Sequence, residues 1–366
     1  MHAATFREYG GPEVLRWEEL PDPEPAPDDV LLEVHACGLN HSDLDSRAGT
    51  SRWPLTFPWV LGAEFAGVVA KVGTEVNGVR VGDPATAFQQ YACGHCAACS
   101  RWRHDLCSRF TVFGTDRWGG YAELVRVPER ALLPLRSADD TIAAAAAQCV
   151  VSTAWSLVNS TANVRAGEAV LVPSASGGVA SAAVQCAKLA GARVIASVGS
   201  PEKVEPVRSL GADVVFCYEE ASIGEVVFEA TDGVGVDAVI DTVGGPRFVE
   251  HLAALRPDGR LATCGAHAGE VVQLDLIDLF RRGHRILGFR VATPDEIRCA
   301  LKLALDGGIR VPVAHTFPLS EAGSAHEFMT RRQHVGKIVL VRDIPASSVS
   351  RQGTAVTGSP SRIGEW

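Results

Sequence analysis

Four cysteines lie close together in the first third of the chain, at a spacing that suits a metal ion. Cys93, Cys96 and Cys99 are three residues apart, and Cys107 follows eight residues later. Four thiolates within one 15-residue segment can close around a tetrahedral metal, and zinc suits such ligands. The closed shell leaves no position for a substrate, so we expect one structural zinc ion that folds an otherwise polar loop. Free thiols, an iron–sulfur cluster and a redox-active CxxC pair are the alternatives.

A second segment, ASGGVA at residues 175–180, has the features of a phosphate-binding loop. It follows an apolar run at 169–172 and opens a helical pattern. In the fingerprint G-x-G-x-x-G/A, the middle glycine lets the backbone approach a pyrophosphate, and the helix N-terminus faces its charge. Gly177 and Ala180 match the middle and last positions, whereas Ala175 replaces the first glycine. An ordinary strand-to-helix turn is the alternative, but the surrounding strands and helix favour a dinucleotide site.

The residues after the next strand bear on which dinucleotide binds. An acidic residue at the end of that strand would bind the ribose 2′-hydroxyl of NAD. Here that position is Gly199, and Ser200, Lys203 and Arg208 follow as groups that can meet a 2′-phosphate. We therefore expect NADPH rather than NADH, with a merely solvated lysine as the alternative.

The elements that must position these groups fall into two kinds. Residues 1–150 are β-rich, with frequent Gly and Pro and no helical periodicity, which is typical of a barrel-like β domain. After an Ala-rich helix expected at 141–155, fully apolar strands alternate with helices. We expect these strands at 169–172, 193–198, 214–216, 236–241, 259–264 and 285–289. About six such strands indicate a doubly wound parallel sheet covered on both faces.

This pattern gives an α/β plus β organisation. A cofactor domain is expected at 151–290, between a first domain at 1–150 and a segment at 291–343 that returns to it. A Ser/Gly/Pro/Arg-rich tail at 344–366 is expected to be disordered.

Length and composition agree with a chain of two domains. The chain has 366 residues, 46% hydrophobic and 21% charged, which allows about two domains with ample core. No run approaches about 18 apolar residues, and the first residues lack the apolar centre of a signal peptide, so we expect a cytosolic protein that does not span a membrane. A net charge of -9 argues against nucleic acid as partner and leaves a small-molecule substrate.

Several further motifs carry a resemblance to a known family. They are YGGPEVL at 9–15, CGLNHSD at 37–43, LGAEFAG at 61–67, VGD at 81–83 and SLGAD at 209–213. With the cysteine segment at 93–107 and the loop at 175–180, they make residues 1–342 resemble the medium-chain dehydrogenase/reductase superfamily, which contains zinc alcohol dehydrogenases and quinone oxidoreductases. The resemblance implies a GroES-like catalytic domain around a Rossmann NAD(P)-binding domain, an active site in the cleft between them, and a homodimer or homotetramer.

Departures from the zinc alcohol dehydrogenase pattern decide the expected chemistry. Those enzymes place a Cys ligand where this chain has Asn40 and a His ligand where it has Ala63, while Cys149 matches the third ligand. One matched ligand of three will not hold a catalytic zinc ion. A rearranged site built from Cys37, Glu64 and Cys149 is the alternative.

Without a Lewis acid, conjugate reduction of an activated alkene is the more accessible reaction, because the charge that follows hydride transfer spreads into an enolate. The resemblance therefore implies a zinc-independent NADPH reductase of quinones, enones or related C=C bonds. Asn40 is expected to orient the substrate or donate to its oxyanion, and Ser42 matches the family's proton-relay hydroxyl. The resemblance assigns cofactor contacts to Thr153, Ser176, Gly177, Gly178, Val179, Ser200, Lys203, Gly244, Gly265 and Phe289.

Two rival functions remain at this point. One is an alcohol or polyol dehydrogenase with the rearranged metal site. The other is a regulatory protein that binds NADPH without turnover, since the phosphate loop alone does not require catalysis.

Overall fold

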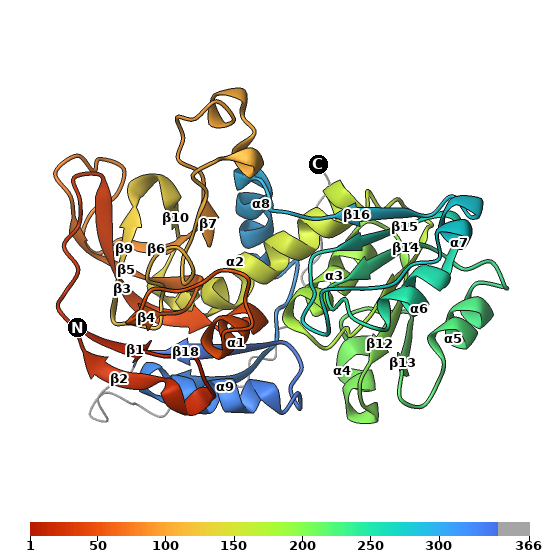
Figure 1. The fold of residues 1–366 in the computed structure, drawn as a ribbon. Coiled ribbons are helices and arrows are strands. Elements are labelled where there is room, and N and C mark those ends of the chain that lie inside the picture. The colour runs from red at the N-terminus through yellow and green to blue at the C-terminus, as the bar shows by residue number, and fades with distance from the viewer. Residues whose placement is uncertain (343–366) are drawn as a thin grey trace, which may run out of the picture.

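The β-rich unit takes its strands from both ends of the chain. The computed structural model describes residues 1–342, so the tail expected at 344–366 lies outside the described residues. The main sheet has the strand order β10-β6-β5-β3-β18-β17, with β9 also paired to β3. Figure 1 shows the C-terminal strand β18, in blue, lying among the red strands of the N-terminus. The strands are β3 (Asp29–Gly38), β5 (Glu64–Val72), β6 (Pro84–Ala87), β9 (Leu124–Pro128), β10 (Leu132–Pro134), β17 (Val313–Pro318) and β18 (Lys337–Val341).

Smaller elements complete this unit. A three-stranded sheet has the order β2-β1-β4, and a two-stranded ribbon of β7 and β8 carries the cysteine segment at its tip, at the top of Figure 1. Two helices of the unit are α1, which follows β3, and α9, which precedes β18. Their bounds are β1 (His2–Phe6), β2 (Arg16–Glu19), β4 (Trp59–Val60), β7 (Gln90–Tyr91), β8 (Thr111–Val112), α1 (His41–Ala48) and α9 (Ala322–Thr330).

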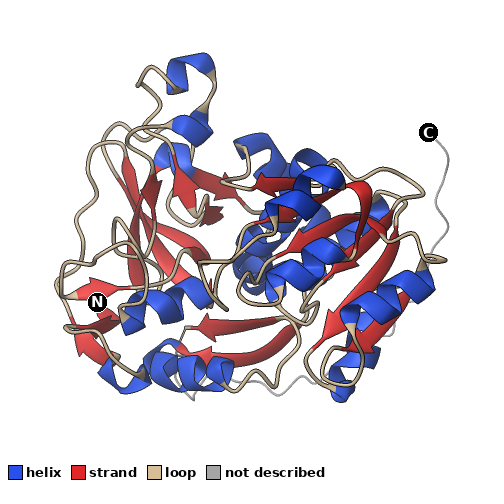
Figure 2. Cartoon of the chain, turned by 45° about the vertical axis from the view of Figure 1, so that its right-hand side comes forward, coloured by secondary structure: helices blue, strands red, loops and turns tan. Residues whose placement is uncertain are grey.

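The α/β unit is a six-stranded parallel sheet with the order β13-β12-β11-β14-β15-β16. In order along the unit this is 3-2-1-4-5-6, the doubly wound arrangement that binds dinucleotides at the carboxyl ends of its strands. Figure 2 shows helices on both sides of these strands. The strands are β11 (Ala169–Val172), β12 (Arg193–Val198), β13 (Val214–Cys217), β14 (Val236–Asp241), β15 (Leu255–Thr263) and β16 (Arg285–Gly288), and the helices are α3 (Gly178–Leu189), α4 (Val204–Arg208), α5 (Ile223–Ala230), α6 (Phe248–Ala253) and α7 (Leu276–Arg281).

Helix α2 (Thr141–Trp155) joins the two units. It contacts β3, β5 and β18 on one side and α3 on the other, and α8 (Pro294–Leu305) packs along it. The stretch 138–161 is long and apolar enough to span a membrane, yet 78% of its most apolar window is buried within the molecule, as expected of a core helix. The domain boundary expected at residue 150/151 falls inside this continuous helix.

Candidate active site

The segment at 175–180 forms the turn between β11 and α3. Gly177 precedes the first turn of α3 and supplies no side-chain cap, so the first N–H groups of the helix are available to an anion. A Cβ on Gly177 would meet only the carbonyl oxygen of Ser174, at 3.6 Å, whereas a Cβ on Gly178 would lie 3.0 Å from the Lys337 side chain. The open space before Gly177 and the unfilled N–H groups fit a pyrophosphate.

At the end of β12, Ser200 and Lys203, both expected at the 2′-phosphate, differ in their hydrogen-bond partners. Ser200 follows the strand and donates to Glu202 at 2.5 Å. Lys203 is only 7% exposed, and its ammonium donates to the carbonyl of Arg332. The Tyr218 hydroxyl occupies the space beside Gly199 in which a side chain would lie. A Cβ built on Gly199 would be 2.7 Å from that hydroxyl.

The remaining predicted cofactor residues surround the same edge of the sheet. Gly244 follows β14 with φ +66°, and the N–H groups of Val243 and Gly244 donate to the buried carboxylate of Asp241 at 2.9 and 3.2 Å. Gly265 follows β15 and packs so tightly that a Cβ would lie 1.9 Å from the Thr242 carbonyl oxygen. Thr153 is buried on α2, Val179 is half-buried at the start of α3, and Phe289 is half-buried after β16.

A buried ion pair lies where β3, β5 and β18 meet α2. Lys337 Nζ is 2.9 Å from a carboxylate oxygen of Glu64, and the two side chains are 3% and 0% exposed. The same ammonium donates to Asn40 Oδ1 at 2.9 Å and to the carbonyl of Leu39, so each of its three N–H groups has an acceptor. The other Glu64 oxygen accepts from the Cys149 backbone N–H at 2.6 Å. We call Asn40, Glu64 and Lys337 the cleft cluster.

The cleft cluster fixes the orientation of the Asn40 amide. Its oxygen faces Lys337, and its Nδ2 donates to Glu64 at 3.3 Å. An amide nitrogen carries two hydrogens, and within the described residues the second has no acceptor. Asn40 also stands immediately before α1, with its backbone N–H donating to Asp43 at 2.8 Å. The arrangement therefore offers one oriented N–H donor to a ligand.

The rearranged metal site considered from the sequence does not assemble. The Cys37 thiol is fully buried in the barrel core, near Gly62 and Gly120, whereas the next residue of β3, Gly38, lies on the Glu64 side of the sheet. Burial, with Glu64 as a second cause, raises the pKa of the Cys149 thiol well above its usual value. In residues 1–342, the only group of three or more His, Cys, Asp or Glu side chains that converge like metal ligands is the cysteine segment.

That cysteine segment, the lobe at 93–107, fits a tetrahedral metal ion. The four Sγ atoms all lie within 4.8 Å of one another. Three of the Sγ–Sγ distances are 3.5, 3.8 and 3.9 Å. A tetrahedron with metal–sulfur bonds of about 2.3 Å has edges of about 3.8 Å. The four predicted ligands, Cys93, Cys96, Cys99 and Cys107, are thus brought together by the fold.

A series of hydrogen-bonded, buried side chains anchors α1 to the rest of the β-rich unit. Arg47 donates to His326 Nδ1 at 3.2 Å, His326 Nε2 lies 3.1 Å from the Tyr121 hydroxyl, and that hydroxyl donates to Asp43 at 3.4 Å. Since Arg47 has only donors, His326 must carry its hydrogen on Nε2. Burial lowers the pKa of His326 to about 3 and raises that of Asp43 to about 6, the latter opposed by hydrogen bonds from Asn40 and Tyr121. This chain holds the helix that presents Asn40.

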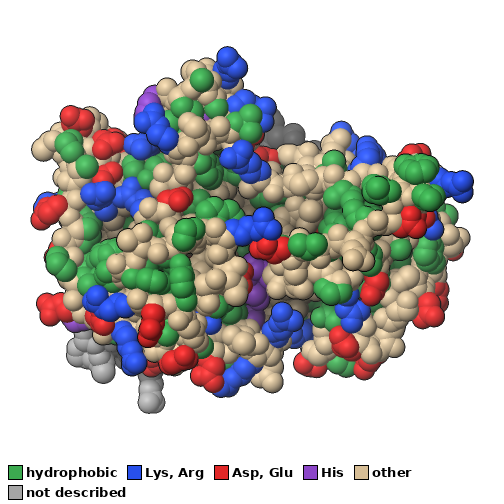
Figure 3. Space-filling model, viewed as in Figure 1, with side chains coloured by type: hydrophobic (Ala, Val, Ile, Leu, Met, Phe, Trp, Pro, Cys, Tyr) green, Lys and Arg blue, Asp and Glu red, His purple; other side chains and the backbone are tan. Residues whose placement is uncertain are grey.

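The two units also touch directly across the cleft. His267, in the loop after β15, places Nδ1 2.7 Å from a carboxylate oxygen of Asp45 on α1. The same loop carries Glu270, which pairs with Arg52 at 2.6 Å. Figure 3 shows charged and histidine side chains gathered at this junction. Ser42, predicted as a relay hydroxyl, is exposed on the first turn of α1.

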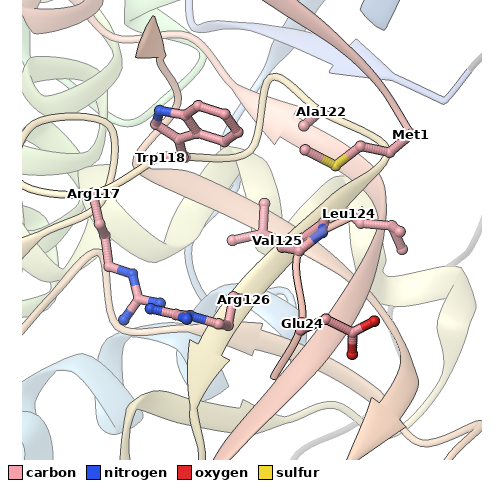
Figure 4. Close-up of a pocket in the computed structure, with 10 residues that line it drawn as sticks. Met1, Glu24, Arg117, Trp118, Ala122, Leu124, Val125 and Arg126 are labelled. Atoms are coloured by element: carbon pink, nitrogen blue, oxygen red, sulfur yellow. The ribbon is translucent and has the colours of Figure 1, made fainter. Parts of the chain in front are cut away.

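A pocket of about 230 Å³ on the β-rich unit lies apart from this cleft (Figure 4). Met1, Leu124 and Val125 line one side, with Trp118 and Arg117 on the other. None of its lining residues belongs to the cleft cluster, so it carries no part of the site.

Lys337, Tyr218 and His267 are site residues that the sequence interpretation missed. Lys337 opens an apolar strand, but nothing in the local sequence shows that its side chain is buried or that it meets Glu64. For Tyr218 and His267 no local motif distinguishes the side chain from a surface residue.

Comparisons with known proteins agree with this geometry. The alcohol dehydrogenase GroES-like domain model matches residues 26–137, and the zinc-binding dehydrogenase model matches residues 178–306. A quinone oxidoreductase from Pseudomonas aeruginosa is 32% identical over 345 residues, covering 92% of this chain and 98% of that protein. A 2-haloacrylate reductase from a Burkholderia species is 31% identical over 355 residues, with coverages of 93% and 98%.

Two solved structures show the same fold. An NAD-dependent alcohol dehydrogenase is 37% identical with a TM-score of 0.87, covering 94% of this chain and all of that one. Escherichia coli quinone oxidoreductase, complexed with NADPH, is 28% identical with a TM-score of 0.79, covering 93% of this chain and all of that one.

Proposed function

Because the chain belongs to the medium-chain dehydrogenase/reductase superfamily and is a nicotinamide-dependent oxidoreductase, we propose that it uses NADPH to reduce a quinone, an enone or another activated C=C bond, without a catalytic zinc ion. The observation that carries the proposal is the cleft cluster. Lys337 places a positive charge beside Glu64 and donates to the Asn40 amide oxygen. The Asn40 amide nitrogen donates one hydrogen to Glu64, and within residues 1–342 its second hydrogen is free for a substrate oxygen.

The residues of this chain divide the work as follows. The N-terminus of α3 binds the pyrophosphate, and the tightly packed turns at Gly244 and Gly265 shape the cleft at the carboxyl ends of the strands. When bound, the nicotinamide supplies the hydride. Asn40 donates to the substrate oxygen as its negative charge grows, and Glu64 and Lys337 hold the amide in that orientation.

Turnover tests this proposal directly. Oxidation of NADPH is followed with 1,4-naphthoquinone, methyl vinyl ketone and acryloyl-coenzyme A, and NADP⁺ reduction is followed with simple alcohols. We expect oxidation with at least one acceptor, little activity with alcohols, and one zinc ion per chain, bound by the lobe. Bound NADPH without turnover would favour the regulatory alternative. Two zinc ions per chain with strong alcohol oxidation would favour the alcohol dehydrogenase alternative.

The NADPH preference rests on the end of β12. Gly199 brings no acidic side chain, the Tyr218 hydroxyl lies beside it, and Ser200 and Lys203 follow it in the chain. We expect Lys203→Ala to weaken NADPH binding about tenfold or more, as for a lost charge-assisted hydrogen bond, with little effect on NADH. Titration calorimetry with both nucleotides measures this. Lys188→Ala, which removes a lysine paired with Asp213 elsewhere on the unit, is the control. Equal losses for NADPH and NADH would contradict the assignment.

A homodimer is proposed through the free edge of the parallel sheet. Among the described strands, β16 pairs only with β15, and apolar side chains beside it are exposed, among them Leu276, Phe280 and Ile286 at 66%, 68% and 36%. An exposed apolar strand edge invites pairing with a second chain. Light scattering of the Phe280→Glu variant is expected to show a monomer, with a persistent dimer as the contrary result.

A further inference from the structure

The strongest unassigned feature is the pair formed by His267 and Asp45 across the cleft. His267 Nδ1 lies 2.7 Å from a carboxylate oxygen of Asp45, and the two side chains are 35% and 39% exposed. The partners are 222 residues apart in the chain, one in the cofactor-binding unit and one on α1. His41, four residues before Asp45 on the same helix face, packs against the His267 ring with centroids 5.1 Å apart.

The contact with Asp45 sets the chemistry of the imidazole. An ionised carboxylate only accepts hydrogen bonds, so Nδ1 carries the hydrogen that it donates to Asp45. The other ring nitrogen, Nε2, is then the atom that gains and loses a proton. A histidine whose tautomer is fixed by a carboxylate is a common general acid or base in enzymes.

The position of the pair is suited to act on a substrate in the cleft. Gly265 lies two residues after β15, at the cofactor edge of the sheet, and His267 follows in the next turn, which Gly269 N–H closes on the Ala266 carbonyl. On the opposite wall, Asn40 immediately precedes α1, the helix that carries Asp45. The imidazole therefore lies where the loop that follows the cofactor edge of the sheet meets the helix that begins after Asn40.

We infer that His267, positioned by Asp45, is the general acid that protonates the α-carbon of an activated alkene after hydride transfer. This rests on the proposed function. The hydride brings two electrons to the β-carbon, and the C=C π pair moves through the α-carbon to the oxygen held by Asn40. As the enolate collapses, the α-carbon forms a C–H bond with the proton from His267 Nε2. The neutral imidazole recovers its proton from water, to which its partly exposed ring has access.

His41 and Ser42, the neighbouring groups that could also donate a proton, are less suited than His267 to act as the general acid. Burial and the nearby charges of His267 and Arg332 lower the pKa of His41 to about 4, against an opposing contribution from Asp45, so His41 is neutral at pH 7. The exposed hydroxyl of Ser42 has no charged partner among the described residues that would make it an acid.

The alternative is that the pair merely holds the two units together. The chain supplies a matched control for this alternative, because the loop that carries His267 also carries Glu270, whose ion pair with Arg52 spans the same junction. Arg52→Gln removes that contact and leaves His267 and Asp45 in place.

The experiment compares two acceptors in the full-length enzyme. A quinone is reduced to a hydroquinone whose oxygen exchanges protons directly with water, whereas an alkene requires a proton on carbon. We expect His267→Asn to lower the ratio of alkene to quinone turnover at least tenfold, Asp45→Asn to lower it to a smaller extent, and Arg52→Gln to leave the ratio at its wild-type value. In D₂O, the wild-type enzyme should place deuterium on one face of the α-carbon, and His267→Asn should place it on both.

The possible outcomes separate the inference from the proposed function. An unchanged ratio and unchanged stereochemistry in His267→Asn, or an equal fall in Arg52→Gln, overturns the inference while the reductase function stands. A wild-type enzyme that reduces quinones but no alkene also overturns the inference alone. A wild-type enzyme that binds NADPH and reduces neither acceptor overturns both.

Discussion

The lobe at 93–107 and the cleft cluster differ in how their charges are balanced. The lobe brings four thiols within 4.8 Å of one another, and its ligand shell contains no cationic side chain. The cleft cluster brings together one carboxylate and one ammonium, which also form hydrogen bonds with Asn40, the Leu39 carbonyl and the Cys149 N–H. Ionised thiols in the lobe require an external cation, whereas Glu64 already has an internal one.

The difference predicts where this chain needs a metal ion for its structure and where it does not. Removal of the ion from the lobe would leave four thiolates to repel one another or take up protons. The cleft cluster balances one negative charge with one positive charge, and the second Asn40 N–H is the donor proposed to meet the substrate oxygen. Three predictions test this contrast, from the largest expected effect to the smallest.

The largest effect is expected from Cys99→Ser. Three ligands with one weak oxygen donor should lose the zinc ion, so the zinc content should fall from one per chain to nearly zero. The lobe then loses its fold, and a destabilisation of about 3 kcal/mol would lower the Tm by about 6–12 °C. Zinc analysis and calorimetry measure both quantities. Cys299→Ser, at an exposed cysteine outside the lobe, is the control. A zinc-free variant with wild-type stability would show that the lobe needs no metal.

The second effect, a loss of stability with the zinc content unchanged, is expected from Lys337→Met. The substitution leaves the Glu64 carboxylate buried without its cation, which costs about 3–5 kcal/mol of unfolding free energy. Adding Glu64→Gln removes the stranded charge and should recover most of the loss, because Gln can still accept from the Cys149 N–H. Urea denaturation of the wild type, the single variant and the double variant measures this. If the double variant is no more stable than Lys337→Met, the two charges are not compensating each other.

The smallest effect is expected in acid, with the lobe saturated with zinc. Burial lowers the pKa of His326 to about 3 in the folded protein. Between pH 6.5 and 3, His326 is therefore protonated in the unfolded chain and neutral in the folded one. Stability should therefore fall with decreasing pH by up to about 1.4 kcal/mol per pH unit from this group. His326→Gln should make the fall between pH 6.5 and 5 shallower in urea denaturation. Its control is His2→Gln, at an exposed site. Identical slopes in His326→Gln and wild type would contradict the assignment.

Features encoded by neighbouring residues were predictable from the sequence. β11 and α2 have the bounds expected, and the remaining strands of the parallel sheet appear at their predicted places, although β15 begins four residues earlier at Leu255. The lobe and the turn at Gly177 were also predictable, because their ligands and glycines lie within single segments.

The rest of the site depends on contacts between distant segments. Lys337 meets Glu64 across 273 residues, and His267 meets Asp45 across 222. No local spacing encodes such pairs, and each partner alone has the sequence pattern of an ordinary charged residue. The same limit applies to Lys203, whose burial against Arg332 depends on a loop more than a hundred residues away.

The bridge between the turn at Gly177 and the C-terminal segment has a consequence for how the enzyme matures. Gly336 N–H donates to the Ser176 carbonyl at 2.9 Å, directly beside the start of β18. On the ribosome, the parallel sheet can assemble as its strands emerge, but the barrel sheet lacks β18, the strand that joins β17 to β3, until almost all of residues 1–342 have been made. A chain stopped short of residue 336 would therefore have its parallel sheet, but it would lack Lys337 and the hydrogen bond from Gly336 to Ser176 that ties the two units together.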